Sequence, residues 1–147
     1  EEESAKKIFK NPFSRMVLPL GGGTNSTQDD IFDAQQNIIR FLAEKSSCVI
    51  VGRCSDYILK DEDVDLTNVF IYAPLEARIK RTMERDKVNE AQALALIKKN
   101  DKQRKCYYDF YTDRKWSSHI NYDLTINSET FGINGTTDII YNAVMNR

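Results

Sequence analysis

The segment 47–59 constrains the fold more than any other part of the sequence. Its residues 48–51 form a short apolar run, which is typical of a strand buried on both faces. Gly52 ends the run, and the polar residues after it predict the start of a short helix. A buried strand that leads through Gly-Arg into a helix places Arg53 at the carboxyl edge of a sheet, where open α/β folds bind ligands. From this segment alone, a surface arginine after a turn is an equal alternative.

Helical and strand patterns alternate along the rest of the chain. Strands are predicted over residues 67–73 and 122–127, and longer helices over 31–45, 74–85, 89–111 and 135–146. We expect the first of these helices to present one apolar face made of Ile31, Phe32, Ala34, Ile38, Ile39 and Leu42. We expect the last one to bury Ile139, Ile140, Ala143 and Val144. This alternation predicts the α/β class, with a parallel sheet flanked by helices on both faces.

Three local signals mark helix starts. Ser26 or Thr27 can cap the first long helix, Pro74 suits the first helical position of the second, and Asn89 can cap the third. Residues 1–30 are predicted to be irregular, because prolines and a glycine-rich run interrupt their apolar positions.

Composition narrows the class of protein. A chain of 147 residues fits a single domain, and its net charge of −1 gives no case for nucleic-acid binding or a polybasic membrane patch. No apolar run approaches the ~20 residues that span a bilayer, and the first residues lack the apolar core of a signal peptide. Three cysteines without metal-ligand spacing indicate reduced thiols and a cytoplasmic protein. Because His119 is the single histidine, no histidine-based metal centre is expected.

The predicted helix after Pro74 carries Arg78, Arg81 and Arg85 on one face. Three guanidinium groups on one face could clamp phosphate oxygens, which the planar arginine fork binds bidentately. A solvated basic face is the more common reason for such a pattern, and spacing alone favours it.

The next helix carries a stripe that changes character along its length. Leu94 and Ile97 begin it as apolar positions, and Asp101, Arg104 and Tyr108 continue it. Either this helix leaves the core at Asp101, or the charged pair faces a site. Asp101 could orient Arg104 toward an anion, or the two could form a surface pair of little energetic value.

No phosphate-binding loop is recognisable. The glycine-rich run 21–27 is the closest candidate, and it lacks the lysine and the second glycine of the P-loop pattern.

Taken together, these segments resemble the cytidylate kinase-like family of nucleoside-monophosphate kinases. The resemblance covers about residues 30–146 and rests on the order of five segments: 31–39 (IFDAQQNII), 48–59 (CVIVGRCSDYIL), 69–78 (VFIYAPLEAR), 101–108 (DKQRKCYY) and 122–128 (YDLTINS). It implies a P-loop kinase-like fold, with a lid-like helical region at about 78–121. It also implies that ATP, carrying Mg²⁺, donates a phosphoryl group to a nucleoside monophosphate such as CMP.

The resemblance also implies roles for particular residues. Arg53 would hold the acceptor nucleotide, and Asp56 lies two residues beyond the position where the family's base-reading aspartate is replaced by Cys54. Arg81 matches a lid arginine, while Asp101 and Arg104 match the Asp-x-x-Arg of the helix that returns from the lid. The strand 124–127 and the loop after it would flank the adenine of ATP. A further lid arginine is replaced by Ile97.

The family's first strand and phosphate loop have no counterpart in this sequence. We expect the chain to be a single but partial domain, because a gap at that central strand would expose sheet edges and apolar surface. The alternative is a non-catalytic nucleotide-sensing or protein-interaction domain that kept the kinase fold.

Overall fold

The computed structural model describes residues 26–146. Predictions that fall on residues 1–25, including most of the glycine-rich run, lie outside this range. The elements, in chain order, are α2 (Ser26–Lys45), α3 (Ser55–Ile58), β1 (Val69–Tyr72), α4 (Leu75–Asp86), α5 (Glu90–Tyr111), the 3-10 helix η1 (His119–Asn121), β2 (Leu124–Asn127) and α6 (Ser128–Met145). The described part is therefore mostly helical, with a small sheet.

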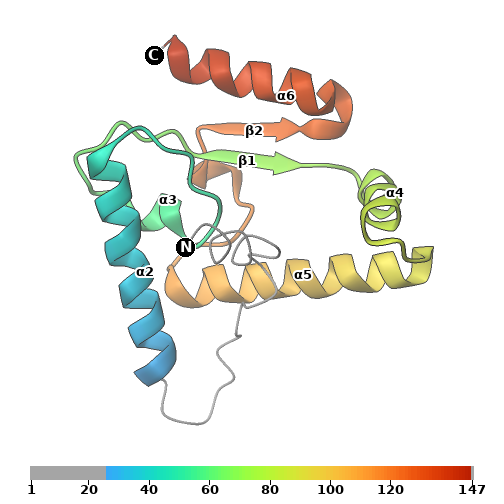
Figure 1. Ribbon diagram of the computed structural model, residues 1–147, viewed down its shortest axis with the longest axis horizontal. Coiled ribbons are helices and arrows are strands. Elements are labelled where there is room, and N and C mark those ends of the chain that lie inside the picture. Colours follow the sequence, from blue (N-terminus) through green and yellow to red (C-terminus); the bar gives the residue numbers. More distant parts are fainter. Residues whose placement is uncertain (1–25, 147) are drawn as a thin grey trace, which may run out of the picture.

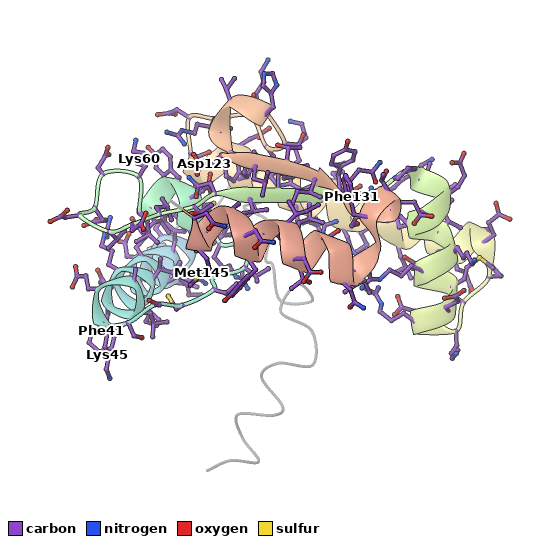
Figure 2. The ribbon with its side chains drawn as sticks, turned by 90° about the horizontal axis from the view of Figure 1, so that it is seen from above. Phe41, Lys45, Lys60, Asp123, Phe131 and Met145 are labelled. Carbon is purple, nitrogen blue, oxygen red and sulfur yellow. The ribbon has the colours of Figure 1, made fainter. Side chains whose placement is uncertain are left out.

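The sheet consists of β1 and β2, which run parallel with Val69 opposite Leu124 and Tyr72 opposite Asn127. The start of the pair is pinned by Asp123, whose Oδ2 accepts a hydrogen bond of 2.7 Å from the backbone N–H of Asn68. Figure 1 shows the strands between α6 on one side and the long helix α5 on the other. In Figure 2, α6 runs alongside the strands, with Phe131 and Met145 toward its two ends. The predicted parallel pairing of these two strands is confirmed.

The main core joins α2, α3 and α5. Its buried side chains are Phe32, Ile39, Cys54, Ile58, Leu59, Tyr107 and Tyr108. Phe32 stacks on Tyr111 with ring centroids 3.9 Å apart, which fixes α2 against the end of α5. Helix α5 begins as predicted: the Asn89 side chain accepts from the Gln92 N–H, and the Gln92 side chain accepts from the Asn89 N–H.

The prediction of a buried strand at 48–51 is wrong. The chain there forms no strand, and Val49 and Val51 are 93% and 75% exposed, whereas Ile50 packs against the core. A strand requires a hydrogen-bonded neighbour, and within residues 26–146 β1 and β2 pair with each other alone. The predicted sheet of three strands is therefore a two-stranded sheet in the described range.

The first and last helices differ from their predicted packing. On α2, Phe32 and Ile39 are buried, while Ile31, Ile38 and Leu42 are exposed, so the buried stripe is rotated by one residue. Helix α6 has two parts divided at Gly132, whose φ of 66° and ψ of 178° are not helical, and the part after this break carries the helix predicted from residue 135.

Burial along α6 also differs from the prediction. Val144 is exposed, and Ile139, Ile140 and Ala143 are half-buried rather than buried. The reason is that α6 packs on a sheet of two strands, which is too narrow to cover the whole helix face.

Helix α4 begins at Leu75, one residue later than predicted, with Pro74 as its N-cap. None of the helices within residues 26–146 has the length and apolar composition to cross a membrane.

Candidate active site

A cleft of about 690 Å³ opens at the carboxyl ends of the two strands. Residues 70–73 of β1 and its end, together with Ser128 and Gly132 of α6, form one side, and charged side chains from α4 and α5 form the other. Ser128 donates a hydrogen bond of 3.1 Å to the Tyr72 carbonyl, which joins the two strand ends. This is the edge of a parallel sheet at which α/β proteins bind ligands.

Asp101 joins two arginines in the wall of this cleft. The Nη2 of Arg78 donates to both carboxylate oxygens of Asp101, each at 2.8 Å, and Arg104 Nη2 donates to Asp101 Oδ1. The three side chains are only about 30% exposed, so solvent screens their charges incompletely. One carboxylate thus holds two guanidinium groups side by side at the cleft.

The predicted proximity of Asp101 and Arg104 is confirmed, and the stripe on α5 faces inward. Ile97 and Tyr108, which lie on either side of the charged pair in that stripe, are buried. Asp101 and Arg104, the charged part of the stripe, therefore line the cleft instead of pointing into bulk solvent.

The arginine face of α4 divides between the cleft and solvent. Arg78 and Arg81 line the cleft, and Arg81 is exposed there. Arg85 instead donates to its neighbour Asp86 from Nε, at 2.7 Å. Arg78 lines the cleft although its spacing favoured a solvated face, because its partner Asp101 is 23 residues away in the chain. Its signal was the i, i+3 spacing from Arg81.

A second cluster surrounds the Gly52-Arg53 turn. Gly52, Arg53 and Cys54 have φ values of 75°, 58° and 57°, three consecutive residues in the left-handed region. Such a conformation costs non-glycine residues about 1 kcal/mol or more each. Burial of the Cys54 side chain and the start of α3 at Ser55 hold it in place.

This turn packs against the last turns of α5. The Arg53 guanidinium lies over the Tyr107 ring at 5.7 Å, and the Tyr107 hydroxyl donates to Gln35 Oε1 at 3.1 Å. Asp56 accepts a hydrogen bond of 2.6 Å from the Tyr108 hydroxyl. Arg53 and Asp56 therefore contact two adjacent residues of α5, Tyr107 and Tyr108.

Cys54 stands where the family resemblance implies an aspartate that reads the base, and its thiol is uncharged, unlike an ionised carboxylate. Burial, followed by the negative charge of Asp56, raises the pKa of the Cys54 thiol to about 12. The group is a neutral thiol inside the core, so it serves packing.

The two clusters share one helix. Arg104 and Tyr107 are three residues apart on α5, a rise of about 4.5 Å along the helix axis. Asp101 and Arg104 face the cleft, and Tyr107 and Tyr108 contact the Arg53 turn. A ligand that reaches from the turn to the cleft would lie alongside α5.

Tyr108→Phe tests the contact between this turn and α5. Loss of the hydrogen bond to Asp56 is expected to lower the free energy of unfolding at neutral pH by about 1–2 kcal/mol. Burial, then the hydrogen bond and charge of Asp56, raise the pKa of the Tyr108 hydroxyl above its ordinary value. The folded state thus keeps a proton that the unfolded state loses above about pH 10, and stability falls as the pH rises through that range. The alkaline fall should be shallower in Tyr108→Phe.

Denaturant unfolding followed between pH 7 and 11 measures both effects. Tyr107→Phe is the matched control at pH 7, because it removes a hydroxyl that donates to the neutral amide of Gln35 and should cost less there. It should also make the alkaline fall shallower, because burial raises the pKa of Tyr107 to about 12. Equal losses in the two variants at neutral pH would contradict a charged acceptor at Tyr108.

Comparison with known proteins identifies the family of this chain. The model of the cytidylate kinase-like family matches residues 1–130. The chain is similar to the cytidylate kinase of Methanoregula boonei, with 29% identity over 118 residues, 79% of this chain and 62% of that protein. It is 31% identical over 108 residues to the cytidylate kinase of Methanococcus aeolicus, covering 72% of this chain and 60% of that protein. The chain thus spans less than two thirds of the length of these two relatives.

A solved structure has the same fold. The crystal structure of an uncharacterized protein from Eubacterium ventriosum superposes with a TM-score of 0.72 at 33% sequence identity, covering 99% of this chain and 81% of that one. The family match over residues 1–130 shows that the chain belongs to the cytidylate kinase-like family.

Proposed function

We propose that the complete protein transfers a phosphoryl group from ATP to a nucleoside monophosphate, with CMP as the first candidate acceptor. The observation that carries this proposal is the pair of guanidinium groups held by Asp101 at the carboxyl ends of the strands. Phosphoryl transfer needs little covalent chemistry from a protein, because positioning and neutralisation of charge on the transferred group supply most of the catalysis. Arg104 and Arg81 would supply that charge, and Asp101 would orient Arg104.

The cleft residues fit the phosphates of a nucleotide. Arg78, Arg81 and Arg104 present planar, permanently charged donors that match phosphate oxygens. Within residues 26–146, no three histidine, cysteine, aspartate or glutamate side chains cluster as a metal site. In the proposed reaction, Mg²⁺ would arrive with the ATP phosphates and shield their charge there.

Arg53 and Asp56 would serve the acceptor nucleotide. Arg53 lies half-buried over Tyr107, in a turn that packing has already fixed, so little ordering would be needed on binding. The Tyr108 hydroxyl fixes the Asp56 carboxylate by a hydrogen bond. In this fixed position, Asp56 would orient the sugar or the base edge of the acceptor.

Arg53→Ala tests the acceptor site. In the complete protein, the variant is expected to raise the KM for CMP by about 10- to 100-fold with a smaller change in the KM for ATP, because a charge-assisted contact to the acceptor is lost. Steady-state kinetics with a panel of monophosphates, each varied against fixed ATP-Mg, gives both constants.

Arg40→Ala is the control, since Arg40 is a half-exposed arginine that pairs with Glu62, outside the cleft. An unchanged KM for every monophosphate in Arg53→Ala would remove Arg53 from the acceptor site.

A second candidate is a nucleotide-binding module without turnover. The sequence favours it in one respect, because it contains no Gly-x-x-x-x-Gly-Lys-Ser/Thr pattern to cradle the donor phosphates. The two candidates differ in a single measurement. A complete protein that binds CMP by calorimetry but forms no CDP with ATP-Mg is a binding module.

A further inference from the structure

Trp116 is fixed to the end of α5 through its backbone. Its N–H donates a hydrogen bond of 3.1 Å to Asp109 Oδ1, and the other carboxylate oxygen of Asp109 accepts from Lys105. The segment after α5 is therefore held against the helix at this point, and the Trp116 side chain has a defined place beside the cleft.

The indole ring contacts both the sheet and the arginine pair. The Phe70 ring of β1 meets it edge-on, with centroids 5.7 Å apart and planes at 79°. The Arg104 Cζ lies over it, 5.5 Å from the ring centroid. Trp116 is thus the aromatic link between β1 and the guanidinium that Asp101 also contacts.

We propose that Trp116 is a positioning residue for Arg104, an inference that rests on the proposed phosphoryl transfer. A hydrogen bond through Nη2 fixes one point of the Arg104 guanidinium, and the indole face adds a second restraint on its plane. An arginine side chain otherwise loses substantial rotamer freedom when it is ordered. Trp116 therefore preorganises the charge that faces the transferred group.

The matched variants separate the aromatic face from the volume of the side chain. Trp116→Met keeps an apolar side chain without a π face, and Trp116→Phe keeps a smaller π face. Tyr122→Met is the control, because Tyr122 also packs on Phe70, with centroids 4.9 Å apart, and does not line the cleft. Trp116→Leu is the second variant without a π face, for use if Trp116→Met does not yield folded protein.

In the complete protein, Trp116→Met is expected to lower kcat by about 10-fold with little change in the KM for the monophosphate. Trp116→Phe and Tyr122→Met should stay within about 2-fold of the wild type. In an Arg104→Ala background, Trp116→Met should cause no further fall, because the two side chains act as one unit. Independent, multiplying effects of the two substitutions would overturn the proposal.

A second measurement does not depend on activity. Phenylglyoxal modifies accessible arginines, and peptide mass analysis of the complete protein reports the rate at Arg104 separately from the other arginines. We expect this rate to rise by about 5-fold in Trp116→Met, since a contact worth about 1 kcal/mol is lost, and to stay near the wild-type value in Trp116→Phe.

Equal modification rates in wild type and Trp116→Met would overturn the positioning role. A raised rate in a complete protein that phosphorylates no monophosphate would support the restraint on Arg104 and overturn the proposed function, so the two failures are distinguishable.

Discussion

Arg104→Ala is expected to lower kcat for CMP phosphorylation by about 10³-fold in the complete protein. Arginines that neutralise charge on a transferred phosphoryl group contribute about 10³–10⁵ to kcat in other phosphoryl-transfer enzymes, and we take the lower limit because Arg78 remains in the same cleft. The KM for CMP should change much less, because the interaction strengthens as charge develops in the transition state.

Initial rates at saturating ATP-Mg, together with thermal unfolding, measure this effect. Arg85→Ala is the matched control, because Arg85 is an arginine that pairs with its neighbour Asp86 outside the cleft, and its loss should leave kcat within about 2-fold. Unchanged kinetics in Arg104→Ala would remove this residue from the reaction.

Asp101→Asn is expected to lower kcat by about 10²-fold. The amide keeps the shape of the side chain but removes the negative charge that holds Arg78 and Arg104 together, so the two guanidinium groups repel each other. The guanidinium groups of Arg78 and Arg104 then no longer keep fixed positions in the cleft. This disorder lowers kcat although neither arginine has been substituted.

The free energy of unfolding should change by only about 1 kcal/mol in Asp101→Asn, because the side chains involved are about 30% exposed and partly solvated. A large loss of stability with a normal kcat would show that Asp101 serves the fold instead. Kinetics and denaturant unfolding on the same preparation decide between these results. Glu62→Gln is the control, since Glu62 pairs with Arg40 and does not line the cleft.

The two predictions address different parts of one arrangement. Arg104→Ala removes a charge that would face the substrate, whereas Asp101→Asn leaves every guanidinium present and removes what holds two of them together. If both variants lose kcat while keeping their stability, the cleft depends on the geometry of its arginines as well as on their number.

Local patterns predicted the elements whose signals lie within a few residues. Helix α5 carries its own capping box at Asn89, and the apolar and β-branched runs at β1 and β2 identified the pair that the structure joins in parallel. The spacing of Asp101 and Arg104 placed both on one stripe of α5, because helix geometry alone determines which positions share a face.

Other predictions failed where the outcome depends on neighbours in space. The run at 48–51 has the composition of a buried strand, yet it belongs to no sheet in the described residues, because strand formation requires a hydrogen-bonding partner. On α2, periodicity allowed several apolar stripes. The buried one contains Phe32, which packs on Tyr107 and Tyr111 of α5, and Ile39, which belongs to the same buried cluster.

The sequence by itself therefore determined the helices, the parallel strand pair and the presence of an Asp-x-x-Arg stripe on α5. Only the tertiary structure decided that Arg78 on α4 meets Asp101 on α5, and that Trp116 covers Arg104 beside Phe70. The physical reason is that helix and strand geometry follow from neighbours in the chain, whereas an ion pair across 23 residues follows from the packing of two helices.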